Sequence, residues 1–304
     1  MCAQGPLKRK LGSARTWVRL AGILVMMACF GGILAQLRTY GVSTLGSVLS
    51  DHGWFLAGSA IVFAACSFLL CEAFFRLLGT PSPVATRSDA WCLFGLSQIG
   101  KYVPGNVFHL VGRQGMGKAA GIGHAVLIKA STLELFGLAL AAACFAPLLA
   151  DAVPSLTVGP IAALAGTLLT LGVAGAGVRY LLGGRIAAAL MLQATFLGAT
   201  AALFAAVAAS LGAADLPLHR VVGAYVVSWL IGFVTPGAPA GVGVRDYALV
   251  ALLGQGERPE VVLAVVAFRV VNIAADVLLF CAALGTRYVR REPLGGERGE
   301  AQPA

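Results

Sequence analysis

Charged side chains interrupt some of the most apolar stretches of this 304-residue chain. A charge at the centre of a membrane helix costs about 2.5–3.5 kcal/mol on insertion scales, so those that persist usually face a bundle interior and take part in function. Seven such residues are candidates for contact with a substrate: Lys101, Lys129, Glu134, Arg245, Asp246, Arg269 and Asp276. Because arginine offers a planar fork and lysine a point charge to phosphate, we expect Lys101, Arg245 and Arg269 to bind a phosphate, with Lys129 in reserve.

One group of these residues has helical spacing. Arg269, Asn272 and Asp276 are separated by three and then four residues, which places them on one face of a helix. We expect this face to point into the bundle, with Asp276 and Asp246 compensating the basic residues when no substrate is bound. Two simpler interpretations remain open: an internal ion pair that only neutralises itself, and an Arg245 side chain that extends to the membrane interface.

Proline and glycine interrupt two further apolar stretches, residues 90–112 and 221–254. The arms on either side of each break are too short to cross a bilayer, and irregular backbone inside a membrane needs protein or a water-filled cavity around it. Paired breaks of this kind point to the binding site of a transporter. We therefore expect two re-entrant segments, although two very short spans per segment would give the same sidedness. The residues of the breaks are Pro104, Gly105, Pro236, Gly237, Pro239, Gly241 and Gly243.

Composition places the rest of the chain in the membrane. The chain is 59% hydrophobic and 12% charged, against about 25% charged for a soluble domain. Six other stretches carry about 20 apolar residues each, enough for a full span. They are residues 20–36, 54–75, 125–149, 157–180, 186–211 and 261–284. The expected fold class is all-α: a polytopic helical membrane protein with six full spans and two re-entrant segments.

The distribution of basic residues indicates orientation. With both broken segments re-entrant, only Arg38, Arg220 and Arg258 of the 22 Lys and Arg residues fall on the outer side, as the positive-inside rule requires. Both termini are then cytoplasmic, and the protein is a multi-pass protein of the cytoplasmic (inner) cell membrane. Two spans, a broken segment and one span follow each other twice in opposite orientations, which predicts an inverted repeat. The expected divisions are a basic N-terminus at 1–19, one membrane domain at 20–285 with halves 20–150 and 157–285, and a disordered tail at 286–304.

Other chemistry finds little support in the sequence. His109 and His124 lack metal-ligand spacing, so a satisfied polar contact is the better expectation for each, and no cofactor is expected. Gln193 has two interpretations, a hydrogen bond to a neighbouring helix or a place in the lining of a cavity, and the first is favoured. Lys129 and Glu134 are five residues apart and do not share a helical face, so each should pair elsewhere. No basic surface suited to nucleic acid is available outside the membrane.

The second break resembles a known family. Residues 236–246 are rich in proline and glycine and end in Gly243-Val244-Arg245-Asp246, which resembles a motif of the lysylphosphatidylglycerol synthase transmembrane-region (flippase-like) family. Residues 100–105, Gly-Lys-Tyr-Val-Pro-Gly, resemble an earlier element of that family, which also commonly has an arginine at the place of Arg269. This chain has Asp246 where the family usually has glutamate. The resemblance implies a stand-alone member without the aminoacyltransferase domain, and therefore lipid translocation or support of a glycan or lipid pathway.

The leading functional hypothesis is a flippase-like transporter of an anionic phospholipid or a polyprenyl-phosphate-linked lipid. Its partners would be the membrane lipid and, for a supporting role, enzymes of lipid or glycan biosynthesis; the oligomeric state is left open. One alternative is a membrane-embedded transferase that acts on a lipid phosphate with Asp246 or His109 as its base. Another is an accessory subunit that organises such enzymes without transporting a substrate.

Overall fold

The computed structural model describes residues 42–290, apart from 80–85, 103–107, 153–157, 236–240, 242 and 255–257. The described part is helical throughout and contains no strand. Five of its helices are long and apolar enough to cross a membrane: Ser50–Leu77, His124–Ala152, Pro160–Leu182, Gly184–Ala213 and Pro259–Tyr288. They coincide with five of the six predicted spans to within a few residues. The remaining predicted span, residues 20–36, lies outside the described residues.

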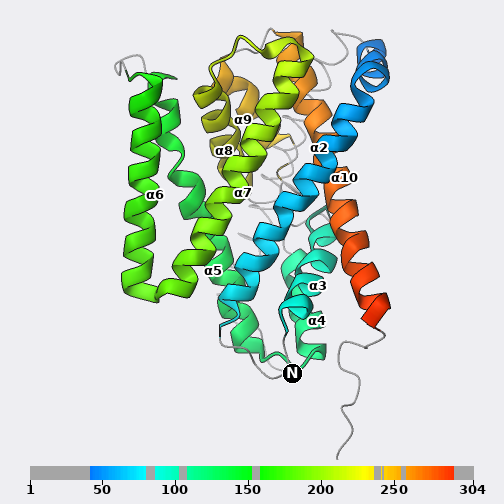
Figure 1. Ribbon diagram of the computed structural model, residues 1–304, viewed down its shortest axis with the longest axis vertical. Helices are drawn as coiled ribbons and strands as arrows, with labels where there is room; N and C mark the ends of the chain where they lie inside the picture. Colours follow the sequence, from blue (N-terminus) through cyan, green and yellow to red (C-terminus); the bar gives the residue numbers. More distant parts are fainter. Residues whose placement is uncertain are drawn as a thin grey trace, which may run out of the picture.

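These long helices form the frame of the bundle (Figure 1). They are α2 (Val42–Leu77), α5 (His124–Ala143) with the 3₁₀ turn η2 (Ala146–Ala152), α6 (Pro160–Leu182), α7 (Gly184–Ala208) with the π-helical turn η3 (Ala209–Ala213), and α10 (Pro259–Arg290). Helix α2 packs against α7 and α10, and α7 packs against α2 and α5. Helix α6 lies at the edge of the bundle and packs mainly against α7 and η2.

Each broken segment forms a helical hairpin. The first hairpin consists of α3 (Arg87–Gln98), the 3₁₀ turn η1 (Ile99–Tyr102) and α4 (Phe108–Ala119), and the second of α8 (Leu218–Val234) and α9 (Val244–Leu253). In Figure 1 the first hairpin lies in the lower half of the bundle and the second in the upper half. Their arms have 12, 12, 17 and 10 residues, fewer than the roughly 20 that cross a bilayer.

Two expectations about the breaks concern the residues at their centres and the end of the first segment. The residues at their centres, Pro104, Gly105, Pro236, Gly237 and Pro239, lie outside the described residues. The first segment was expected to end at residue 112, whereas α4 continues to Ala119. The sequence beyond residue 112 is glycine-rich and basic, and in this respect it resembles a loop. The buried charge of Arg113 in this stretch is, however, compensated by Glu134 of α5.

Local sequence explains where the hairpin helices begin. Thr86 caps α3: its hydroxyl accepts the Asp89 N–H at 3.3 Å, and the Asp89 carboxylate accepts the Thr86 N–H at 2.8 Å. Helix α9 begins after Gly243, whose φ of 83° favours a residue without a Cβ. The Gly243 N–H donates to Asp246 at 3.1 Å. Asp246 therefore fixes the start of α9 as well as contributing a charge.

The second hairpin is closed tightly because of Gly232 on α8. A Cβ at this position would lie 2.8 Å from the Cβ of Arg245 and 3.4 Å from the Cα of Gly241. Real Cβ atoms do not approach so closely, so glycine is needed where α8 passes the start of α9. This close approach holds Arg245 against the hairpin's own first arm.

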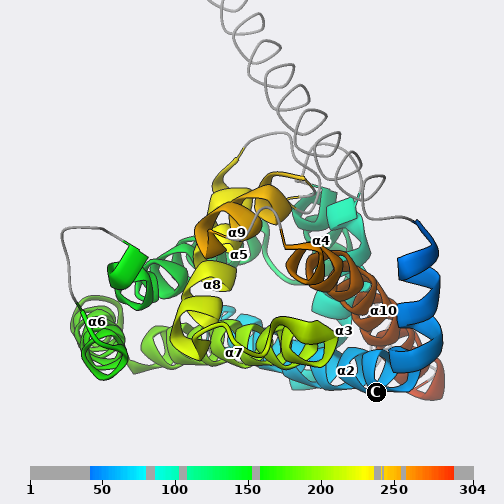
Figure 2. The same ribbon diagram turned by 90° about the horizontal axis from the view of Figure 1, so that it is seen from above.

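An aromatic cluster joins the long helices to the second hairpin. Phe63 of α2, Phe196 and Phe204 of α7, Tyr225 of α8 and Phe268 of α10 contact one another with ring centroids 5.3–5.9 Å apart. Such pairs contribute about 0.5–1.5 kcal/mol each beyond the burial of their area. Seen from above, α2 and α7 run along one side of the molecule and α4, α9 and α10 lie opposite (Figure 2). The cluster therefore holds α2, α7 and α10 against the first arm of the second hairpin.

Candidate functional site

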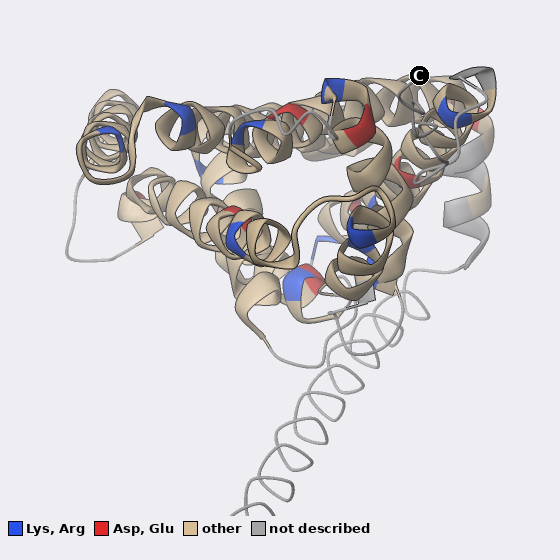
Figure 3. Ribbon diagram, turned by 90° about the horizontal axis from the view of Figure 1, so that it is seen from below, with Lys and Arg blue, Asp and Glu red and all other residues tan. Residues whose placement is uncertain are grey.

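A cavity of about 390 Å³ lies where the two hairpins meet α10. Both breaks contribute to its wall, Lys101 and Tyr102 from the first and Gly241 and Arg245 from the second. Figure 3 marks the charged positions on the helices, and Lys101, Glu134, Arg245, Arg269 and Asp276 are those that line this cavity. The volume is within the range of small-molecule sites, roughly 300–1,000 Å³.

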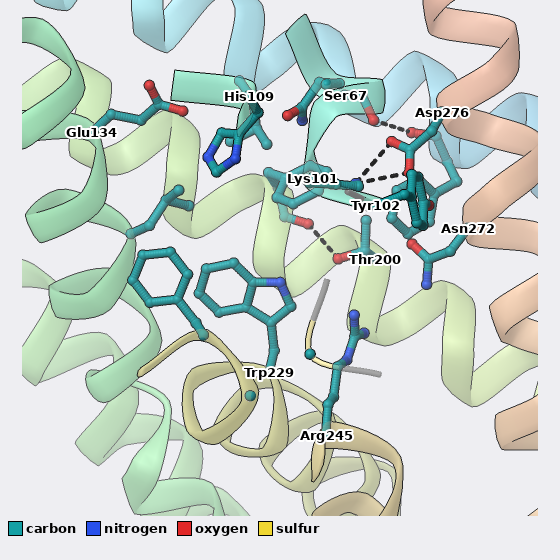
Figure 4. A pocket seen from close by; sticks show the side chains of 18 of the residues that line it. Ser67, Lys101, Tyr102, His109, Glu134, Thr200, Trp229, Arg245, Asn272 and Asp276 are labelled. Atoms are coloured by element: carbon teal, nitrogen blue, oxygen red, sulfur yellow. Dashed lines mark hydrogen bonds and ion pairs between the residues drawn. The ribbon is translucent and has the colours of Figure 1, made fainter. Parts of the chain in front are cut away.

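The first hairpin is attached to α10 by an ion pair. The Lys101 ammonium lies 2.7 Å from one Asp276 carboxylate oxygen and 2.9 Å from the other. The Tyr102 hydroxyl donates to the same carboxylate. Asp276 is 2% exposed, so its charge depends on these two partners. Figure 4 shows the three side chains converging at one end of the cavity.

The second hairpin is attached to α10 by an ion pair of opposite polarity. Arg269 of α10 donates through Nε to an Asp246 oxygen at 2.7 Å and through Nη2 to the Gly241 carbonyl at 3.2 Å. The other Asp246 oxygen accepts the Gly243 N–H. Both oxygens of Asp246 are therefore engaged, which leaves it poorly placed to act as a general base.

Arg245 differs from the other cations of the cavity. It is 8% exposed, and its guanidinium lies 4.6 Å from the centroid of the Tyr225 ring. Within the described part of the chain no carboxylate lies within ion-pair distance of it. Figure 4 shows its side chain directed into the cavity. The expectation that Arg245 extends to a membrane interface does not hold for this buried position.

Arg113 is a buried cation that the sequence analysis missed. It is 0% exposed on α4 and forms an ion pair with Glu134 of α5, which lines the cavity. Its Nε donates to the Ser97 hydroxyl at 3.1 Å, and the guanidinium lies 4.4 Å from the ring centroids of both Phe74 and Phe94. The signal that could have revealed it is Glu134 itself, since a buried carboxylate needs a cation nearby.

The charges of the cavity do not balance. Three ion pairs cancel: Lys101 with Asp276, Arg269 with Asp246, and Arg113 with Glu134. Arg245 then leaves one uncompensated positive charge among the described residues. A buried cation without a partner is costly, and a bound anion is the usual way to meet that cost.

Two polar residues of the cavity have different surroundings. Gln193 donates from Nε2 to the backbone carbonyl of Glu134 at 3.1 Å, which confirms the predicted contact with a neighbouring helix. His109 lines the cavity, but its buried Nδ1 has no hydrogen-bond partner among the described residues. The expectation of a satisfied contact for His109 is therefore wrong for this nitrogen.

Most of the predicted site residues meet at this cavity. Five of them line it: Lys101, Glu134, Arg245, Arg269 and Asp276. Asp246 is paired with Arg269 of the lining. Asn272 lines it as well, so the predicted inward face of α10 is confirmed. Lys129 is the exception: it is exposed on α5, on a different face from the buried Glu134.

The remaining wall is largely apolar and rich in aromatic rings. Trp229 and Phe233 of α8 stack with ring centroids 4.9 Å apart, and Phe63, Phe196 and Tyr225 of the aromatic cluster complete this side. No group of three His, Cys, Asp or Glu side chains among the described residues is arranged to hold a metal ion. The arrangement suits a ligand with one anionic group and an apolar portion.

Comparison with known proteins adds no relative: no protein-family model, curated protein or solved structure matches this chain.

Proposed function

We propose that this protein is a flippase-like transporter that moves an anionic lipid, a phospholipid or a polyprenyl-phosphate-linked lipid, across the cytoplasmic membrane. The observation that carries the proposal is Arg245, a buried cation that faces a cavity between two broken helical segments and has no carboxylate partner in the described part of the chain. Arginine matches phosphate oxygens with its planar fork of donors. Lys101 and Arg269 would add positive charge to the site when their ion pairs with Asp276 and Asp246 open.

The packing of the helices supports an inverted repeat of two halves. In this proposal α2, the first hairpin and α5 correspond to α7, the second hairpin and α10. Contacts then occur in matched pairs: α2 with α10 and α7 with α5, α3 with α10 and α8 with α5, and α2 with α7 across the centre. The hairpins would enter the bilayer from opposite faces as re-entrant segments. Residues 20–36 would add the sixth span, and both termini would be cytoplasmic.

The ion pairs follow the same correspondence. The second arm of each hairpin pairs with the long helix that follows it, Arg113 of α4 with Glu134 of α5 and Asp246 of α9 with Arg269 of α10. The polarity is reversed between the two halves. Such pairs keep charge available at mid-membrane while limiting its cost, which is what transporters of polar headgroups require.

A lipid would use the two parts of the cavity differently. Its phosphate would bind near Arg245, while the aromatic side formed by Trp229, Phe233 and Phe196 would face the apolar part of the molecule. The tails would stay in the bilayer. Exposure of the cavity to alternate sides would follow from movement of one half against the other.

Proteoliposomes containing fluorescent phosphatidylglycerol test this proposal. Arg245→Gln is expected to slow translocation about tenfold or more, because a hydrogen bond to a charged group contributes about 1.5–3 kcal/mol. Arg185→Gln is the matched control, since Arg185 is exposed at the start of α7. Unchanged translocation in Arg245→Gln would contradict the assigned site, and an inactive wild-type protein with every anionic lipid would contradict the function.

A transferase is the second candidate because His109 places in the cavity a ring nitrogen that has no hydrogen-bond partner within the described ranges. That nitrogen could accept a proton from a lipid acceptor, a role for which Asp246 is less suited since both its oxygens are engaged. Formation of a modified lipid by the purified protein would favour the transferase over the transporter.

A further inference from the structure

Each hairpin contributes to the cavity lining one basic group that has no ionic partner among the described residues. From the second hairpin this group is Arg245, and from the first it is His109. The Nδ1 atom of His109 is buried and makes no hydrogen bond with the described residues. Leaving such an atom unsatisfied is costly, so its position at a cavity points to a partner that arrives with the ligand.

None of the described groups around His109 supplies an unpaired negative charge to it. Arg113 follows one turn later on α4, and its charge is balanced by Glu134 of α5. From η1, Lys101 and Tyr102 face the same cavity, and both are held by Asp276 of α10. From α3, Gln98 lines the cavity and carries no charge.

Among the described residues that line the same cavity as His109, Arg245 is the cation for which no carboxylate partner is found. Because the ion pairs cancel, a proton on His109 would add a second positive charge to the one that is in excess among the described residues of the cavity. An anion in the cavity reverses this balance. It supplies the negative charge, and its oxygen can accept a hydrogen bond from Nδ1.

We propose that the cavity binds a phosphodiester anion together with a proton, with the proton on His109 and the anion between His109 and Arg245. This inference rests on the proposed transport function and names the ion that would accompany the lipid. The proton comes from the water on the side where the lipid binds and returns to water where the lipid leaves. The loaded cavity then carries the same net charge as the empty one, so both can change exposure at similar electrostatic cost.

Linkage fixes the direction of the pH effect. If the anion favours proton binding at His109, the proton must favour anion binding by the same factor. Anion affinity should therefore rise as the pH falls through the range in which histidine titrates. A coupling of typical size corresponds to a change of about 5- to 150-fold.

The test measures binding of short-chain phosphatidylglycerol to the full chain in detergent at about pH 5.5 and about pH 8.5. The phosphodiester of this probe keeps its charge over that range, so a change in affinity reports the protein. We expect the wild type to bind about tenfold more tightly at the lower pH. His109→Gln should remove the pH dependence, and His109→Arg should bind tightly at both pH values because its charge is permanent.

His219→Gln is the matched control. His219 lies at the start of α8 and contacts Asp151 at 3.2 Å, away from the cavity lining, so this variant should keep the wild-type pH dependence. The inference is overturned if wild-type affinity does not change with pH, or if His109→Gln retains the change. Lipid translocation without pH dependence would overturn this inference alone, whereas no binding at either pH would overturn the proposed function as well.

Discussion

Replacing Arg245 with methionine tests whether its charge serves a ligand or the stability of the fold. Arg113 and Arg245 are both buried arginines that lie on aromatic rings. They differ in their ionic partners, because Arg113 is paired with Glu134 and Arg245 has no carboxylate partner among the described residues. We therefore expect Arg113→Met to destabilise the protein and Arg245→Met to leave its stability nearly unchanged or to raise it.

The expected sizes follow from these contacts. Arg113→Met leaves the carboxylate of Glu134 buried without its partner, and breaking a buried pair in this way costs about 3–5 kcal/mol. Arg245→Met loses the contact with Tyr225, which is worth about 0.5–2 kcal/mol. It also removes a buried charge whose desolvation costs several kcal/mol. The second effect equals or exceeds the first, so the two variants should differ by about 3 kcal/mol or more.

Thermal unfolding of the purified protein, followed by tryptophan fluorescence, measures this difference. Adding short-chain phosphatidylglycerol at about 100 times its Kd should stabilise the wild type by about 2.7 kcal/mol and leave Arg245→Met unaffected. A loss of stability in Arg245→Met as large as that in Arg113→Met would refute the argument. It would mean that Arg245 holds the fold together and is not kept for a ligand.

Two further predictions concern packing and pH. Gly232→Ala should lower the Tm and weaken lipid binding, because its Cβ would meet that of Arg245 at 2.8 Å and overpacking costs about 1–3 kcal/mol; Gly177→Ala on α6, where the Cβ meets open space, is the control and should not lower the Tm. Asp215, in the loop before α8, receives hydrogen bonds from Arg258 at 2.7 and 2.9 Å, which lower the pKa of its carboxyl. A lowered pKa stabilises the fold above the unfolded pKa of about 3.9, so the Tm difference between wild type and Asp215→Asn should be present at neutral pH and vanish as the pH falls through the lowered pKa.

The sequence predicts the long helices and the inward face of α10 well. Length and hydropathy suffice for the helices, because a bilayer imposes about 20 apolar residues on any span. The spacing of Arg269, Asn272 and Asp276 suffices for the face, since helical geometry alone brings the three together. These expectations need no knowledge of how distant segments pack.

The partners of the charges were harder to predict because they depend on tertiary packing. Arg269 pairs with Asp246 and Asp276 with Lys101, so these two charges of α10 do not neutralise each other. Arg113 was missed because a glycine-rich, basic sequence resembles a loop until Glu134 is seen beside it. Lys129 is a further candidate for binding phosphate by sequence. It lies five residues from Glu134 on α5, and its helical face points away from the cavity.

Helix α10 carries both residues that pair with the hairpins, Arg269 and Asp276, which lie about 10 Å apart along its axis. A turn of this one helix about its axis would carry both side chains out of the cavity at once. A movement of either hairpin alone would separate only its own pair and leave the other in place. A cross-link that prevents α10 from turning should therefore still allow either hairpin to separate from its own partner on this helix.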